Sequence, residues 1–171
     1  MNIVLCGMMG SGKTTTGIRI SELTGMRWYD TDDLITQKYG KISDIFEFYG
    51  EARFRELETE VVRSVAGEEN CVISTGGGCV LKPENSAAFK ESGGKIVFLK
   101  ASIETLFARA GHTGDERPLL KNTTFGHMKA LLDARTPVYV GCADVTVETD
   151  GKSVDEVARE VISACGVQVR A

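Results

Sequence analysis

The segment Gly7-Met8-Met9-Gly10-Ser11-Gly12-Lys13-Thr14 fits the pattern G-x-x-x-x-G-K-[ST] at every fixed position. Its glycines let successive backbone N–H groups point into one concavity, which forms an anion site where a helix begins. Lys13 would reach the β- and γ-phosphates of a nucleotide as a point charge, and the Thr14 hydroxyl would coordinate Mg²⁺. The residues predicted to bind the nucleotide phosphates are Gly10, Ser11, Gly12, Lys13, Thr14 and Thr15.

A phosphate-binding loop occurs both in enzymes and in molecular switches. A GTPase-like switch would need a guanine-reading N-K-x-D and an Asp-x-x-Gly after a strand, and we find neither in this sequence. An ATP-dependent transferase is therefore favoured. A catalytically silent binding or regulatory protein is the alternative from another class, and the presence of Lys13, Thr14 and Asp32 argues against it.

Two carboxylates, Asp30 and Asp32, follow the apolar pair Trp28-Tyr29, where a second strand should end. Ligands of open α/β sheets bind beyond the carboxyl ends of the strands, so both carboxylates are well placed for chemistry. One could hold the metal through water, and the other could accept a proton from a substrate hydroxyl. The structural alternative is that Asp32 and Asp33 are simply acids at the start of a helix.

Three consecutive glycines, Gly76 to Gly78, directly follow another predicted strand. Glycines there cost chain entropy and add nothing to a core, so we expect the backbone to approach a ligand closely. Arg117 lies in a polar loop over residues 111–122 and could swing onto a transferring phosphoryl group. Arg55, taken alone, is typical of a solvated helix charge, and Arg135 suits the dipole near the end of a helix.

The elements that must position these residues follow from the apolar pattern. Short apolar runs predict buried strands at 3–6, 71–74, 96–99 and 145–147, with a further strand ending at Tyr29. Helices are predicted over 13–23, 51–66, 83 to about 93, and 102–110, and from residues 124 and 153 onward. Pro137 should bend or end the helix that begins near residue 124. This alternation predicts one α/β domain with a parallel sheet covered on both faces.

Composition limits the class of protein further. The 171 residues include 20 Lys and Arg against 24 Asp and Glu, a net charge of −4, which argues against a general nucleic-acid binder. No stretch approaches the ~20 apolar residues of a membrane helix, and the N-terminus lacks a signal peptide's basic region. The five scattered cysteines suggest neither disulfides nor a zinc site. We therefore expect a cytoplasmic protein with no membrane or nucleic-acid partner. Separately from composition, we expect a monomer.

Taken together, these motifs resemble the shikimate kinase family. The resemblance covers residues 7 to about 140, and its motifs run in the family's order. The phosphate-binding loop is common to many families, whereas the other five motifs are much more specific. The six are G-x-x-G-x-G-K-T at Gly7–Thr14, D-x-D at Asp30 and Asp32, F-R-x-x-E at Phe54, Arg55 and Glu58, G-G-G at Gly76–Gly78, R-P-L-L at Arg117–Leu120, and R-x-P-x-Y at Arg135, Pro137 and Tyr139.

The resemblance implies an α/β, three-layer P-loop kinase fold of the nucleoside-monophosphate-kinase-like type, with a five-stranded parallel sheet flanked by helices. Residues 1–171 would form a single kinase domain, with a substrate-binding segment at about 31–60 and a closing lid at about 111–122. The implied reaction is ATP-dependent phosphorylation of the 3-hydroxyl of shikimate, giving shikimate 3-phosphate and ADP. This step belongs to the pathway to chorismate and aromatic amino acids, and Mg²⁺ would be the cofactor.

The resemblance also implies roles for the reacting end of the site. Asp32 would bind the substrate hydroxyls and act as the proton acceptor, and Asp30 would support Mg²⁺ beside Thr14. Arg117 would come from the lid to the phosphates of ATP and complete the catalytic set with Lys13 and Asp32. Closure of such a lid would also protect ATP from water.

For the acceptor, the resemblance implies that Arg55 and Arg135 hold the shikimate carboxylate and that the backbone of Gly77 and Gly78 contacts the substrate. Two arginines can clamp a carboxylate bidentately, which agrees with this assignment. Glu58 could orient Arg55 or simply pair with a neighbour along the helix.

The sequence departs from the family pattern after its last strand. That segment usually carries a basic residue and a proline, but here it is Asp150-Gly151-Lys152-Ser153, so no contact with the base is assigned. Arg109 is a candidate to pack on adenine. The main rival among enzymes is another small-molecule kinase of this fold, such as a gluconate or nucleoside-monophosphate kinase.

Overall fold

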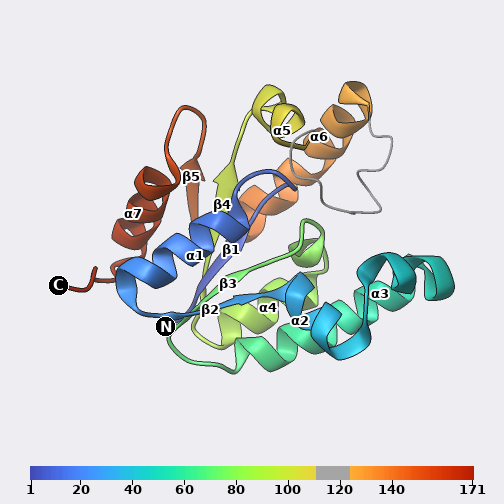
Figure 1. Ribbon diagram of the computed structural model, residues 1–171, viewed down its shortest axis with the longest axis horizontal. Coiled ribbons are helices and arrows are strands. Elements are labelled where there is room, and N and C mark those ends of the chain that lie inside the picture. Colours follow the sequence, from blue (N-terminus) through green and yellow to red (C-terminus); the bar gives the residue numbers. More distant parts are fainter. Residues whose placement is uncertain (111–123) are drawn as a thin grey trace.

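The structure is a computed structural model that describes residues 1–110 and 124–171 (Figure 1). Within these ranges it contains one five-stranded sheet in the order β2-β3-β1-β4-β5, and every neighbouring pair is parallel. Val4 in the central strand pairs with Ile73 on one side and Ile96 on the other. The predicted parallel sheet is confirmed. Its strands are β1 (Ile3–Cys6), β2 (Arg27–Asp30), β3 (Cys71–Ser74), β4 (Lys95–Lys100) and β5 (Val145–Glu148).

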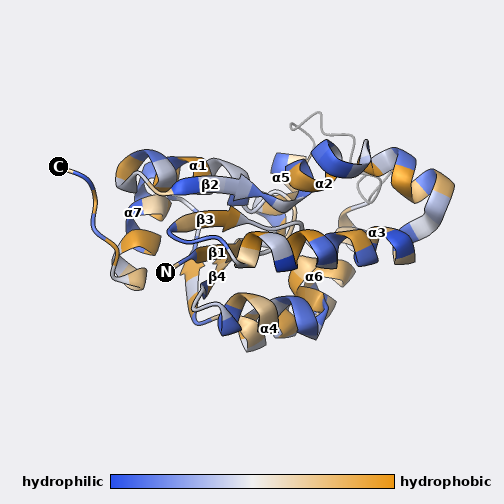
Figure 2. Ribbon diagram, turned by 90° about the horizontal axis from the view of Figure 1, so that it is seen from below, coloured by the Kyte–Doolittle hydropathy of each residue, from blue (hydrophilic) through white to orange (hydrophobic). Residues whose placement is uncertain are grey.

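Helices cover both faces of this sheet, because the strand residues alternate between two cores. Ile3 and Leu5 pack toward α1 and α7, whereas Val4 and Cys6 pack toward α3, α4 and α6. In Figure 2 the ribbons of β1 and β3 are hydrophobic, as burial on both faces requires. The helices are α1 (Lys13–Thr24), α2 (Thr31–Tyr39), α3 (Ile42–Ala66), α4 (Pro83–Glu91), α5 (Ile103–Ala110), α6 (Phe125–Cys142) and α7 (Val154–Cys165), with a 3₁₀ turn η1 (Cys79–Leu81).

A third, smaller core lies between α2 and α3 and is built around Ile35, Ile45 and Phe54. In Figure 1 this part of α3 extends beyond the sheet. The helix is interrupted at Gly50, whose φ of 83° and ψ of 171° are not helical. The predicted helix over 51–66 begins directly after this glycine, which adopts positive φ without the steric cost of a Cβ. Helix α2 was not predicted as an element, although its acidic start was noted as an alternative.

Two helix ends lie close to their predicted positions, at residues 23 and 153. Gly25 ends α1 in the left-handed region, and Ser153 and Glu156 form a reciprocal capping box at the start of α7. In contrast, α6 continues past Pro137 to Cys142, so this proline does not end the helix. Proline cannot donate the backbone hydrogen bond that a helix interior needs, which destabilises the helix at Pro137. Tyr139 is fully buried half a turn later, and its packing offsets that loss. No helix in the described part of the chain is long and apolar enough to cross a membrane.

Candidate active site

The phosphate-binding loop (Gly7–Thr14) leads from the end of β1 into α1. Gly10 and Gly12 have φ values of 84° and 90°, which residues with a Cβ rarely adopt. Gly12 is the N-cap of α1 and offers no side-chain cap, so the start of the helix is open to an anion. The Lys13 ammonium donates to the carbonyls of Gly7 and Met8 at 2.6 and 2.9 Å, which holds its charge over the loop.

Thr14 and Asp30 meet at one end of this loop. The Thr14 hydroxyl donates to Asp30 Oδ2 at 3.0 Å. The other carboxylate oxygen of Asp30 accepts from the backbone N–H groups of Asp32 and Asp33, at 2.9 and 3.3 Å, and caps α2. The acids at 30–33 therefore do begin a helix, as the structural alternative proposed, and Asp30 also reaches Thr14. A hydroxyl and a carboxylate are hard oxygen donors of the kind that Mg²⁺ prefers.

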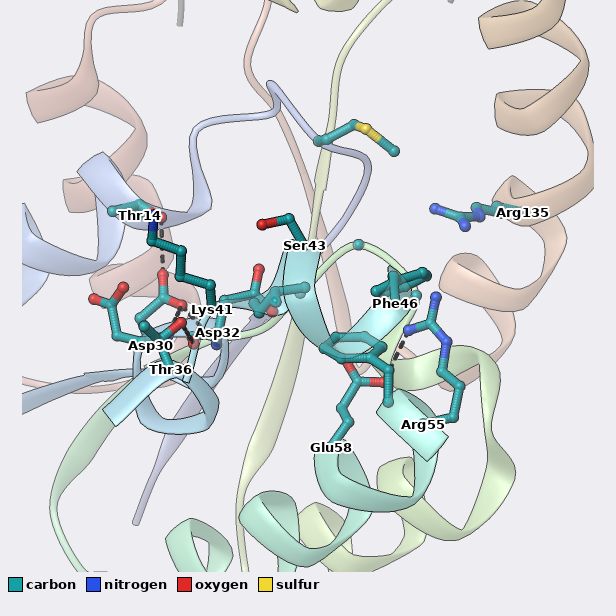
Figure 3. A pocket seen from close by; sticks show the side chains of 17 residues that line it. Thr14, Asp30, Asp32, Thr36, Lys41, Ser43, Phe46, Arg55, Glu58 and Arg135 are labelled. Atoms are coloured by element: carbon teal, nitrogen blue, oxygen red, sulfur yellow. Dashed lines mark hydrogen bonds and ion pairs between the residues drawn. The ribbon is translucent and has the colours of Figure 1, made fainter. Parts of the chain in front are cut away.

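A cavity of about 490 Å³ opens beside these residues, between the phosphate-binding loop, α2, α3, the turn after β3, and α6 (Figure 3). Charged and polar side chains dominate one part of its lining and Met9, Ile42, Phe46 and Phe54 supply an apolar part. The charged and polar lining residues are Thr14, Asp30, Asp32, Asp33, Thr36, Lys41, Ser43, Arg55, Glu58 and Arg135, with Gly76, Gly77 and Gly78 as backbone wall.

The three glycines after β3 are required by close approach. A Cβ at Gly76 would lie 2.8 Å from Asp32 Oδ1, and one at Gly78 would lie 2.5 Å from Arg55 Nη2. A Cβ at Gly77 would lie 3.4 Å from Arg135 Nη1. The groups that approach this backbone are charged side chains of the cavity. Close approach of the backbone to a ligand stays a prediction. One turn of the chain brings Asp32, Arg55 and Arg135 around a common point.

Arg55 is held by a buried carboxylate rather than solvated. Its Nη1 donates to Glu58 Oε1 at 2.9 Å, and the Glu58 side chain is 1% exposed. Burial raises the pKa of Glu58, while the charge of Arg55 acts to lower it and that of Asp32 to raise it. Burial acts to lower the pKa of Arg55, but Glu58 and Glu51 outweigh it and the pKa is raised. The expectation of a solvated charge is wrong for Arg55, and Glu58 orients its guanidinium toward the cavity.

Arg135 lies in the interior of α6, not near its end as the sequence suggested, because the helix continues to Cys142. The residue is buried, and its Nη1 has no hydrogen-bond partner among the described residues. In Figure 3 its guanidinium points into the cavity, on the same side as Arg55. A buried guanidinium nitrogen without an acceptor is costly unless a ligand supplies one, so this corner of the cavity suits an anion.

Two predicted nucleotide contacts have different outcomes. Arg117 and the proposed lid at 111–122 lie outside the described residues. Arg109 donates from Nη1 to the Gly10 carbonyl at 3.0 Å, so it supports the phosphate-binding loop from α5. Its packing on adenine stays a prediction.

Comparison with known proteins decides the family. The family model for shikimate kinase matches residues 9–166 of this chain. This chain belongs to the shikimate kinase family. A shikimate kinase of Geobacter sulfurreducens is 46% identical over 163 residues, which cover 94% of this chain and 88% of the relative. A shikimate kinase of Symbiobacterium thermophilum is 43% identical over 165 residues, covering 95% and 94%.

Solved structures agree with this assignment. The shikimate kinase of Acinetobacter baumannii in complex with shikimate superposes with a TM-score of 0.90 at 34% identity, covering 96% of this chain and 92% of that one. A gluconokinase of Sinorhizobium meliloti reaches a TM-score of 0.57 at 18% identity, which is a likeness of fold alone. The predicted shikimate kinase family and its three-layer P-loop fold are confirmed, and the chain is an ATP-dependent kinase by family.

Part of the cavity wall in this shikimate kinase family member is not evident from the sequence. Thr36, Lys41, Ser43 and Phe46 line the cavity, and none was singled out beforehand. Thr36 lies in α2, Lys41 is the N-cap residue of α3, and Ser43 and Phe46 lie in the first turns of α3. Their approach to the cavity depends on how α2 and α3 pack, so it is not evident from their spacing. The aromatic spacing of Phe46 and Phe54, whose rings lie 4.8 Å apart, was the one available signal.

Proposed function

We propose that this protein transfers the γ-phosphoryl group of ATP to the 3-hydroxyl of shikimate, giving shikimate 3-phosphate and ADP. One observation carries the proposal: Arg55 and Arg135 face the same glycine turn in a cavity that also contains Asp32 and Thr14. Two guanidinium groups match an acceptor carboxylate, Asp32 matches a hydroxyl, and Thr14 belongs to the nucleotide side. The Acinetobacter baumannii relative, solved with shikimate, supports this choice of acceptor.

On the nucleotide side, we assign phosphate binding to the backbone N–H groups of residues 10–15 and to Lys13. In the structure the ammonium donates to two backbone carbonyls, which are neutral acceptors. Phosphate oxygens carry charge and form stronger hydrogen bonds with an ammonium, so Lys13 would exchange these carbonyls for the β- and γ-phosphates. The open N-terminus of α1 adds a partial positive charge at the same place.

A divalent cation is expected for an ATP-using kinase, and we propose Mg²⁺ held by Thr14 and Asp30. Their oxygens lie 3.0 Å apart, and no soft ligand is needed. When bound, the ion neutralises charge on the phosphate oxygens. The cap that Asp30 makes on α2 keeps its second carboxylate oxygen directed at Thr14, so one side chain links the nucleotide side to the acceptor side.

On the acceptor side, Arg55 and Arg135 would bind the carboxylate, and the backbone of Gly77 and Gly78 would contact the ring substituents. Asp32 would accept the hydrogen bond, and then the proton, of the 3-hydroxyl as its oxygen attacks phosphorus. The cavity would hold both reactants in line, and such positioning supplies most of the rate in phosphoryl transfer. Arg117, within a lid at about 111–122, is proposed to stabilise the transferring phosphoryl group.

We further propose that residues 1–171 act as a single kinase domain with the acceptor-binding segment at about 31–60, and as a cytoplasmic monomer. Purified protein analysed by light scattering would test the monomer. The α2–α3 core around Ile35 and Phe54 supports the segment as a local packing unit.

An assay of ADP release with shikimate, gluconate and nucleoside monophosphates tests the reaction. We expect turnover with shikimate of roughly 1–100 s⁻¹, in the range of other kinases, and none above background with the other acceptors. ³¹P–¹³C correlation in the product should place phosphorus on the C3 oxygen. Rapid phosphorylation of gluconate without turnover of shikimate would show that the acceptor is wrong.

A further inference from the structure

Tyr139 is a fully buried residue to which the proposed reaction gives no role. Its hydroxyl donates to the carbonyl of Gly77 at 2.5 Å, which joins α6 to the glycine turn. Its ring stacks on Phe98 of β4, with centroids 5.1 Å apart and an interplanar angle of 26°. The side chain is therefore fixed at the ring by the sheet and at the hydroxyl by the wall of the acceptor cavity.

Tyr139 and Arg135 are four residues apart on α6 and so lie on the same face of the helix. Arg135 Nη1 would lie 3.4 Å from a Cβ at Gly77, the residue whose carbonyl Tyr139 binds. Burial raises the pKa of Tyr139 to about 12, although the charge of Arg135 and a hydrogen-bonding contact with it act to lower the pKa. The hydroxyl therefore keeps its proton near neutral pH and remains a donor to Gly77.

The planarity of the peptide group gives this hydrogen bond a consequence inside the cavity. The carbonyl of Gly77 and the N–H of Gly78 belong to one peptide plane and point in opposite directions. Three consecutive glycines leave this plane more conformational freedom than any other residues would. A donor that fixes the carbonyl therefore fixes the direction of the Gly78 N–H, which faces the acceptor in the proposed reaction.

We propose that Tyr139 is a positioning residue of the acceptor site, which sets the Gly77–Gly78 peptide and the Arg135 guanidinium in their binding arrangement before the acceptor arrives. The inference rests on the proposed function for the identity of the acceptor. The spacing of the motifs does not reveal this role, because the hydrogen bond joins two distant segments, the turn after β3 and the interior of α6. Preorganisation of this kind lowers the ordering cost of binding without touching the ligand.

The kinetic test is Tyr139→Phe, which keeps the ring stack and removes only the hydroxyl. We expect the KM for shikimate to rise about tenfold, since the orphaned carbonyl and the loosened guanidinium both weaken the site. The KM for ATP should stay within twofold. Ser21→Ala is a matched control, because it also removes a short hydroxyl–carbonyl bond, of 2.6 Å to Met26, in another part of the molecule. It should lower the melting temperature without raising the KM for shikimate.

A double-mutant cycle separates positioning from general destabilisation. If Tyr139 acts through Arg135, Tyr139→Phe should change the KM for shikimate less than threefold when Arg135→Lys is already present. Fully additive effects, or an equal rise in the KM for ATP, would overturn the proposal.

A measurement without substrate makes the result independent of the acceptor. ¹⁵N relaxation of the arginine Nε–H groups should give Arg135 a rigid order parameter in the wild type and a value below about 0.6 in Tyr139→Phe, with Arg55 unchanged. The Arg135 signal is assigned by its loss in Arg135→Lys. An unchanged order parameter refutes positioning by Tyr139. The expected loss of order in a protein that does not phosphorylate shikimate would refute the proposed function alone.

Discussion

The phosphate-binding loop and the acceptor cavity lie side by side but are built in different ways. The loop is one continuous segment, Gly7 to Thr14, whose working groups are backbone N–H groups and a lysine that binds its own loop. The acceptor cavity takes its working groups from α2, α3, the turn after β3, and α6, and it depends on long side chains. Its positive groups are set by partners such as Glu58, whose side chain is 1% exposed.

Because they are built differently, the two sites should respond differently to substitution. A loop of contiguous backbone is insensitive to most distant side chains, since local geometry holds it. A cavity assembled from separate elements is sensitive to any residue that shifts one element against another. Variants in the acceptor cavity should therefore alter shikimate binding or turnover while leaving ATP affinity nearly constant.

Asp32→Asn should give the largest effect. We expect kcat to fall about 10²–10⁴-fold, because the proton acceptor is lost, while the Kd for ATP changes less than twofold. Asp44→Asn is the control, since Asp44 is an exposed acid in the first turn of α3 and does not line the cavity. Steady-state kinetics and calorimetry provide the two values. Near-normal turnover of Asp32→Asn would contradict the role of Asp32.

Arg55→Ala should come next, with an effect on binding of the acceptor. Loss of a charged, two-donor contact of about 2–3 kcal/mol predicts a Kd for shikimate some 30–150-fold higher. The Kd for ATP, measured by calorimetry, should stay within twofold of the wild-type value. Arg53 is the matched control, because it lies on the same helix but pairs with Glu56 at the surface. If the affinities for shikimate and ATP fall equally, the two sites are not separable in this way.

A pair of glycine variants compares the two regions directly. Gly78→Ala forces Arg55 aside and should raise the KM for shikimate about tenfold with little effect on ATP. Gly12→Ala introduces a side chain at a φ of 90° and should raise the KM for ATP several-fold instead, through strain of about 1–3 kcal/mol. Gly126→Ala, in open space on α6, should change neither. The opposite pattern would mean that the regions are not independent.

The smallest effect is expected from Lys41→Ser. Lys41 is the N-cap residue of α3 and makes no side-chain cap, so serine should stabilise that helix end by about 0.5–1 kcal/mol. Hydrogen exchange should slow at the start of α3 and leave the phosphate-binding loop unchanged. Lys82→Ser, at the uncapped start of α4, is the matched control and should protect only α4. Slower exchange throughout the molecule would show that the acceptor segment is not a separate unit.

Much of the fold could be predicted because local rules govern it. The alternation of apolar strands with capped helices gave the parallel sheet, and Gly25, Gly50 and the Ser153–Glu156 box marked helix ends or breaks. Pro137 was predicted to bend or end its helix and does not end it, because the effect of a proline depends on packing: Tyr139 is buried against Phe98 beyond the proline, and the helix continues. Helix α2 is hard to predict because its strongest local signal, Asp30, serves two purposes: it caps the helix and also reaches Thr14, as a metal ligand would.

The phosphate-binding loop can be recognised from the sequence alone. Its glycines, lysine and threonine lie within eight adjacent residues, so local geometry is enough to bring them together. The sequence also identified the family, through motifs in a fixed order. Packing of the helices on the sheet is needed to see that a buried Glu58 holds Arg55, that Arg135 lies inside a helix, and that Tyr139 joins this helix to the glycine turn. The reason is physical: contacts between distant segments depend on how helices pack on the sheet, and residue spacing along the chain does not encode that packing directly.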